Sequence, residues 1–273
     1  MPLVVCATPI GNLEDVTLRV LRVLREAEVV LCEDTRTTRT LLSRYEISRP
    51  LVSYHARNEA ARTAEILPRL RAGDQVALAS DAGLPGVNDP GAALIRAAID
   101  AGVEVTVLPG PSAVETALVA SGLVGARFAF VGYLPRAAGA LERLWAETAA
   151  WTWPVVAFES PRRLPASLAS LAAFDAGRSV AVCRELTKRF EEIVRGPAAE
   201  LAERFREAPR GEVTLVLGAA EPAAAAVAPG VSEHDAVAAV SDLVEAGIPR
   251  RRAAGLVSRL TGLPRNRLYR GSL

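Results

Sequence analysis

The sequence contains neither a GxxxxGK[ST] phosphate loop nor a GxGxxG fingerprint. It therefore lacks the motifs that best indicate binding of ATP, GTP or NAD. No apolar run approaches the roughly 18 residues of a membrane span, and no basic leader precedes the first apolar run, so we expect a cytoplasmic protein. Histidine and cysteine are scarce, with two and three residues. Cys6, Cys32 and Cys183 lie far apart, within or at the end of apolar runs. They are expected to be buried free thiols, and no metal site is expected.

Lysine is also nearly absent, because Lys188 is the only lysine and arginine occupies every other basic position. A compositional drift toward arginine is one explanation. The sharper interpretation is a site that requires an amine, since the two side chains differ in hydration and in how readily they lose a proton. The net charge is only +1, but seven arginines and no acidic residue fall between residues 247 and 273. This segment predicts an RNA-binding positive surface, with a solvated basic face as the alternative.

The most informative segment is the stretch 75–91. It begins as an apolar run through Ser80, of the length expected for a strand buried on both faces of a parallel sheet. The next eleven residues, DAGLPGVNDPG, hold three glycines, two prolines and two aspartates, so they form neither strand nor regular helix. Ligands bind at the carboxyl ends of strands in open α/β sheets. We therefore interpret this segment as a binding loop, with a tight structural turn as the alternative.

Strands and helices alternate along the first half of the chain. Apolar runs at 3–7, 28–32, 51–54, 76–80 and 103–108 are each followed by a polar or glycine- and proline-rich exit and a helical pattern. Five alternations with short connections predict a parallel sheet with helices on both faces. In the second half, the runs that end at Cys183 and begin at Glu191 are too close to hold a helix between them, which predicts antiparallel pairs.

These patterns predict an α/β fold with three parts. An N-terminal α/β domain with a parallel sheet spans 1–120, and a second α/β domain with a mixed sheet spans 121–220. A small basic helical module spans 231–273. The segment 221–230, EPAAAAVAPG, has the composition of a linker.

Seven loop motifs match one known family in order: TPIGN, CEDTR, SDAGLPGVNDPG, PGPSA, FVGYLPR, FESPRR and CRELTK. On these motifs the sequence resembles the bacterial small-subunit ribosomal RNA methyltransferase I family, a branch of the tetrapyrrole-methylase superfamily. The resemblance extends from residue 3 to about residue 217. It implies two α/β domains of the tetrapyrrole-methylase type, with S-adenosyl-L-methionine in the cleft between them, and a homodimer. It also implies methylation of the ribose 2′-hydroxyl of a decoding-site cytidine in the 16S rRNA of the 30S ribosomal subunit.

The resemblance also assigns roles to residues by their place in the motifs. The cofactor is expected to lie against Ser80, Asp81, Ala82, Gly83, Pro109, Gly110, Ser112, Phe130, Gly132, Leu134, Ser160 and Pro161. The first-strand loop is expected to contact substrate through Pro9, Gly11 and Asn12. Arginine binds phosphate bidentately, so RNA is expected to contact the arginines that flank the cleft motifs, Arg36, Arg39, Arg136, Arg162 and Arg163.

Methyl transfer from a sulfonium to oxygen is an in-line displacement, so much of the catalysis is positioning. A ribose hydroxyl also needs a proton acceptor, which contributes about 100- to 10,000-fold. The first candidate is Lys188, as a neutral amine, unless Glu185 pairs with it and keeps it charged. The other candidates are Glu33 and Asp34, because repulsion between adjacent carboxylates raises one pKa. Helix capping and simple salt bridges are the structural alternatives.

Two competing functions are also considered. A tetrapyrrole C-methyltransferase would share the fold and the cofactor, although the CEDTR loop and the basic C-terminal module argue against it. A noncatalytic RNA-binding or ribosome assembly factor that keeps the fold is the alternative from a different class.

Overall fold

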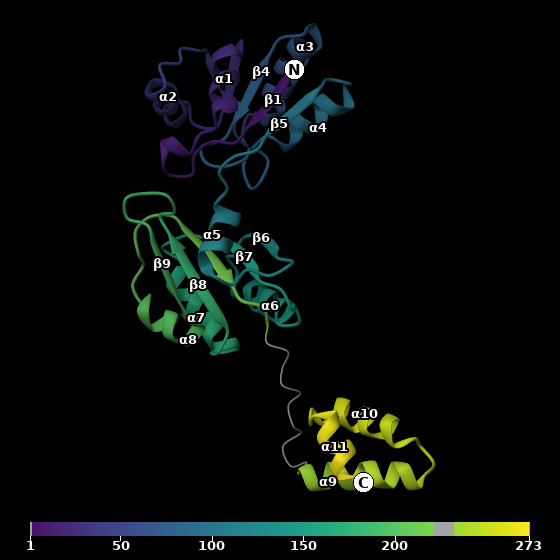
Figure 1. Ribbon diagram of the computed structural model, residues 1–273. Coiled ribbons are helices and arrows are strands. Elements are labelled where there is room, and N and C mark those ends of the chain that lie inside the picture. Colours follow the sequence, from purple (N-terminus) through teal and green to yellow (C-terminus); the bar gives the residue numbers. More distant parts are fainter. Residues whose placement is uncertain (1, 221–231, 273) are drawn as a thin grey trace. The chain divides into compact units, whose positions relative to one another are not determined.

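The computed structural model describes residues 2–220 and 232–272 (Figure 1). The predicted linker at 221–230 lies outside these described residues. Contacts divide the chain into two units, one within Met1–Arg143 and Pro154–Gly218 and the other within Leu144–Trp153 and Ala219–Leu273. None of the helices in the described ranges combines the length and the apolar character that crossing a bilayer would need. The predicted domain limits stay a prediction.

The first unit contains a parallel five-stranded sheet in the order β3-β2-β4-β1-β5. Its strands are β1 (Leu3–Cys6), β2 (Val29–Cys32), β3 (Leu51–Ser53), β4 (Val76–Ala79) and β5 (Val105–Leu108). Every residue of β1, β2 and β4 is buried, which explains their unbroken apolar sequences. The parallel sheet predicted from five strand-and-helix alternations is confirmed.

Helices cover both faces of this sheet (Figure 1). They are α1 (Leu18–Glu26), α2 (Thr35–Arg44), α3 (Glu59–Ala72) and α4 (Ala92–Asp100), and a short 3-10 helix, η1 (Leu13–Asp15), precedes α1. Successive strand side chains point to opposite faces. Val4 and Val30 therefore pack with α1 and α2, whereas Val5 and Leu31 pack with α3 and α4.

A second five-stranded sheet has the order β6-β7-β10-β8-β9. Its strands are β6 (Ala129–Tyr133), β7 (Val155–Glu159), β8 (Ser179–Arg184), β9 (Glu192–Pro197) and β10 (Val213–Leu217). Strands β6 and β7 run parallel, while the pairs β7–β10, β10–β8 and β8–β9 are antiparallel. The predicted mixed sheet is confirmed, with β8 and β9 joined by the short CRELTK connection.

Helix α5 (Ala113–Ser121) follows β5 in sequence but packs on the second sheet. Val114 and Leu118 share a core with Val156 and Val216. The remaining helices of this part of the chain are α6 (Ala138–Thr148), α7 (Leu164–Phe174) and α8 (Ala198–Arg204). Because β5 belongs to the first sheet and α5 packs on the second, the chain passes between them at residues 109–112.

Three helices form the last part of the described chain, α9 (Glu233–Glu245), α10 (Arg250–Thr261) and α11 (Arg265–Gly271). Their core contains Ala236, Val240 and Leu268. Helix α9 begins with a capping box, in which Ser232 and Asp235 satisfy each other's backbone N–H groups. The predicted small helical module is confirmed.

Candidate functional site

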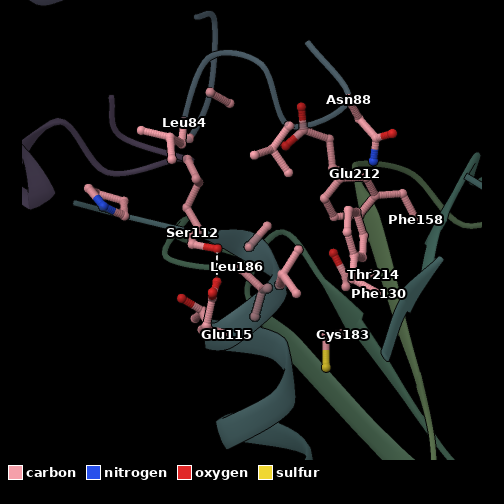
Figure 2. A pocket seen from close by; sticks show the side chains of 18 of the residues that line it. Leu84, Asn88, Ser112, Glu115, Phe130, Phe158, Cys183, Leu186, Glu212 and Thr214 are labelled. Carbon is pink, nitrogen blue, oxygen red and sulfur yellow. Dashed lines mark hydrogen bonds between the residues drawn. The ribbon is translucent and has the colours of Figure 1, made fainter. Parts of the chain in front are cut away.

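A cavity of about 1050 Å³ lies where loops of the first sheet meet the second sheet (Figure 2). The loops after β1, β4 and β5 line one part, and α5 with β6, β7, β8 and β10 line the rest. Figure 2 shows Leu84 and Asn88 from the loop after β4, together with Phe130 and Phe158 from the second sheet and Leu186 from the turn after β8. The volume is at the upper end of the range of about 300–1,000 Å³ for small-molecule sites.

The loop after β4 has a fixed shape because it pairs with the loop after β1. Thr8 and Gly83 exchange backbone hydrogen bonds, with N to O distances of 2.8 and 3.0 Å. The Ser80 hydroxyl donates to the Gly83 carbonyl at 3.0 Å. Gly83 has a φ of +78°, which favours glycine. The loop therefore presents Ala82 and Leu84 to the cavity.

The structure separates the residues expected to bind the cofactor into two sets. Those that line the cavity are Ala82, Gly83, Pro109, Gly110, Ser112, Phe130, Ser160 and Pro161. The other four do not line the cavity and support its wall instead: Ser80, Asp81, Gly132 and Leu134. Asp81 accepts the N–H of Asp34 at 2.9 Å. At Gly132 a Cβ would lie 3.1 Å from Asn88 Oδ1, so this glycine leaves room for Asn88.

The first-strand loop contacts the cavity through residues that the sequence did not single out. Ala7 and Ile10 line it, whereas Pro9, Gly11 and Asn12 do not. The Asn12 side chain accepts the N–H of Glu14 at 3.1 Å, which caps η1.

Of the five arginines expected to contact RNA, Arg36, Arg39, Arg136 and Arg162 are exposed. Arg163 differs, because its guanidinium makes two hydrogen bonds of 2.9 Å to the Glu159 carboxylate. It also donates to the Leu134 carbonyl at 2.6 Å. Arg163 therefore joins the ends of β6, β7 and α7 and has few donors left for a phosphate.

Lys188 lies outside the cavity lining and is held by two carboxylates. Its Nζ is 2.9 Å from Glu185 Oε1 and 2.9 Å from Glu212 Oε2. Partial burial opposes its charge, but hydrogen bonds with Glu212 and Glu185 outweigh burial and raise the pKa of Lys188. The ammonium form is therefore favoured, as in the salt-bridge alternative considered from sequence.

Glu33 and Asp34 also lie outside the cavity lining, and their environments differ. The Asp34 side chain caps α2 and pairs with Arg36. Hydrogen bonds from Arg36 lower the pKa of Asp34 to about 2. Burial and the charge of Asp81 raise the pKa of Glu33. The adjacent carboxylates therefore do have separated pKa values, mainly because Arg36 contacts only one of them.

Several polar residues of the cavity were missed as site residues from sequence: Asn88, Asp89, Glu115, Tyr133, Glu159 and Glu212. Asp89 carried a signal, since it lies in the glycine- and proline-rich loop that was interpreted as a binding loop. Glu159 ends a buried strand directly before the motif's Ser160, at a strand end where ligands are expected. Tyr133 also carried a signal, since it lies in the FVGYLPR motif between Gly132 and Leu134, whereas Glu212 lies in none of the motifs. Within the described ranges, no group of three or more His, Cys, Asp or Glu side chains is placed to hold a metal ion.

Comparison with known proteins decides the family. Residues 2–202 match the family model described as Tetrapyrrole (Corrin/Porphyrin) Methylases. The chain belongs to the tetrapyrrole methylase family. Among methylase relatives, a protein from Micromonospora olivasterospora named Ribosomal RNA small subunit methyltransferase I is 45% identical over 96% of this chain and 83% of its own length. A Thermotoga maritima protein of the same name is 43% identical over 80% of this chain and 99% of its own length.

Solved structures of methylases share the fold. The uroporphyrin-III C-methyltransferase of Thermus thermophilus, complexed with S-adenosyl homocysteine, superposes with a TM-score of 0.56. It is 23% identical and covers 80% of this chain and 97% of that one. The predicted tetrapyrrole-methylase type of fold is confirmed.

The residues of the cavity fit S-adenosyl-L-methionine, the cofactor of the methylase family. Phe130 and Phe158 offer apolar ring surfaces, with centroids 5.0 Å apart, suited to a planar base. Gly83 lines the cavity and leaves backbone open for close approach, whereas the missing Cβ of Gly110 makes room for Ala7. Hydroxyl groups such as that of Thr214 can bond a ribose or an amino acid group.

Proposed function

We propose that this protein transfers a methyl group from S-adenosyl-L-methionine to the ribose 2′-hydroxyl of a decoding-site cytidine in 16S rRNA. The observation that carries the proposal is the 45% identity, over 96% of the chain, to a protein named Ribosomal RNA small subunit methyltransferase I. The proposal is supported by the cavity, because loops that carry several of the family motifs line it. A homodimer and a cytoplasmic location stay predictions.

The residues of the chain act mainly by positioning. When bound, S-adenosyl-L-methionine supplies a methyl group activated by a sulfonium. The loops after β4 and β5 line the cavity and would hold the cofactor there, and alignment of the reacting groups would supply much of the catalysis. Lys188 acts through its ion pairs, because it fixes Glu212 at the cavity and stays protonated. This role replaces that of a neutral amine.

The direct test uses radiolabelled S-adenosyl-L-methionine and 30S subunits from cells that lack the enzyme. Label on the ribose of a single 16S rRNA cytidine is the expected result. Label on a porphyrinoid instead would favour a tetrapyrrole C-methyltransferase. Cofactor binding with no transfer to either substrate would favour a noncatalytic assembly factor.

The C-terminal helices are proposed to add RNA affinity. Arg251 and Arg252 are exposed at the start of α10. Replacing both by glutamate is expected to weaken 30S binding by at least about tenfold and to reduce its salt dependence, because phosphate contacts release counterions. Cofactor affinity should not change.

The matched control for this double variant replaces Arg19 and Arg22 by glutamate, since both are exposed on α1. The two variants carry the same change in net charge. An equal loss of 30S affinity in both would mean that overall charge, and not α10, determines binding. Deletion of residues 231–273 should weaken RNA binding in the same direction.

A further inference from the structure

Four carboxylates line the cavity, those of Asp89, Glu115, Glu159 and Glu212. Three of them are engaged. Glu115 accepts a hydrogen bond from the Ser112 hydroxyl, drawn as a dashed line in Figure 2. Glu159 is bound by Arg163, and Glu212 is bound by Lys188. No hydrogen bond or ion pair from the described residues reaches the carboxylate of Asp89.

The backbone on either side of Asp89 holds it in place. Asn88 adopts a left-handed conformation with φ of 60°, and its side chain packs against Gly132 of β6. On the other side, Gly91 has φ of +137°, and its N–H donates to Glu59 Oε1 at 3.0 Å. Non-glycine residues in the left-handed region cluster at functional sites. Asp89 is therefore fixed at the cavity wall although its carboxylate is unpaired.

The surroundings of Asp89 favour proton uptake. Burial, followed by the charges of Glu33 and Asp81, raises the pKa of Asp89 to about 6. Tyr133, at the end of β6, faces it as well, and burial together with the charge of Asp89 raises the pKa of that phenol. Glu33 follows β2 and Asp81 follows β4. The titratable neighbours of Asp89 after both strands are therefore acidic. A carboxylate with a pKa near the working pH is suited to general-base catalysis.

We propose that Asp89 is the catalytic base of the methyl transfer, an inference that rests on the proposed function. Its carboxylate accepts the 2′-hydroxyl proton while the ribose oxygen forms a bond to the methyl carbon. The carbon–sulfur bond breaks and its electron pair stays on sulfur, which becomes a neutral thioether. Protonated Asp89 then releases the proton to water. Glu33 is a positioning residue that acts on Asp89 through its charge and does not touch substrate.

The test compares the wild-type protein with Asp89→Asn in single-turnover methyl transfer to 30S subunits between about pH 5 and pH 9. The wild-type rate should rise tenfold per pH unit below about pH 6 and level off above it. Asp89→Asn should be about 100- to 10,000-fold slower at pH 8, with the rise lost. Its affinity for S-adenosyl-L-methionine, measured by calorimetry, should stay within about twofold. Glu33→Gln should move the rise to lower pH, because it removes a neighbouring negative charge.

The control is Asp100→Asn, because Asp100 is exposed on α4 and paired with Arg96. It should match the wild type. Asp89→Asn within about threefold of the wild-type rate would overturn the inference, as would a rate loss fully explained by weaker cofactor binding. A wild-type protein that labels no 30S subunit would instead refute the proposed function.

Thermal unfolding shows whether the Asp89 variant is folded. The raised pKa in the folded state means that protonated Asp89 stabilises the fold below about pH 4 and that this stability is lost as pH rises through about 6. Asparagine carries no charge to bury. Asp89→Asn should therefore unfold at a higher temperature than the wild type at pH 8, with a smaller difference at pH 4. Asp89→Ala, assayed in parallel, should lose the same activity.

Discussion

Replacing Arg163 by alanine is expected to lower the free energy of unfolding by about 3 to 5 kcal/mol. The partner of Arg163 is the Glu159 carboxylate, whose side chain has 0% exposure. Removal of one member of a buried ion pair leaves the other charge uncompensated in a poorly solvated place. Among the described residues, Glu159 would keep hydrogen bonds only from the Ser160 N–H and the Ser167 hydroxyl. The change should also loosen the cavity wall, because Glu159 lines it.

Denaturant unfolding of three variants separates the charge effect from the loss of packing. Arg162→Ala is the control, since Arg162 is the exposed neighbour, and it should change stability by less than about 0.5 kcal/mol. Adding Glu159→Gln to Arg163→Ala should recover part of the loss, because a neutral amide leaves no buried charge. A loss below about 1 kcal/mol in Arg163→Ala would contradict the structural role and return Arg163 to the RNA-binding candidates.

Replacing Gly11 by alanine is expected to slow methyl transfer by about 100-fold. A Cβ at Gly11 would lie 2.5 Å from Lys188 Cγ, 2.7 Å from the Leu186 carbonyl oxygen and 2.8 Å from Thr187 Oγ1. The lysine stem can move, but the carbonyl belongs to a turn in which Glu185 and Thr187 both have positive φ. The methyl group therefore pushes apart the loop after β1 and the turn after β8. Displacement of about 1 Å at a reacting centre costs about this factor.

The same substitution should cost about 1 to 3 kcal/mol of stability through overpacking. Gly139→Ala is the matched control, because no neighbouring atom in the described part of the chain lies within 4 Å of its Cβ position in α6. Alanine there should be neutral or slightly stabilising. Methyl transfer by Gly11→Ala at the wild-type rate would show that the contact between the two loops does not position the site.

The fold was largely predictable because local patterns determine it. The buried strands β1, β2 and β4 have unbroken apolar sequences, and the glycine- and proline-rich exits set where each one ends. The sheet on which α5 packs was not predictable. The apolar residues of α5 predict a buried helix, but they do not indicate which sheet the helix packs against. Only the three-dimensional structure assigns Val114 and Leu118 to the second sheet.

The site was predictable in outline but not in its charges. Several motif loops contribute residues to one cavity, Gly83 and Ser112 among them, whereas no residue of the CEDTR loop lines it. Partners distant in sequence decided the rest. The pairing of Lys188 with Glu185 was considered from sequence, but the contact with Glu212, 24 residues away, was not. Asp89 differs from Glu159 because no described cation contacts it. Sequence spacing alone does not report such contacts.

Residues 109–112 are the covalent passage between the two sheets, and they also line the cavity. A ligand that contacts them therefore binds to the segment that connects the two sheets. Binding to the folded state alone stabilises a protein by about 2.7 kcal/mol at a ligand concentration 100 times the dissociation constant. A methyl donor bound against residues 109–112 would therefore also stabilise the connection between the two sheets. The two sheets should therefore move less relative to each other in the cofactor-saturated protein than in the free protein.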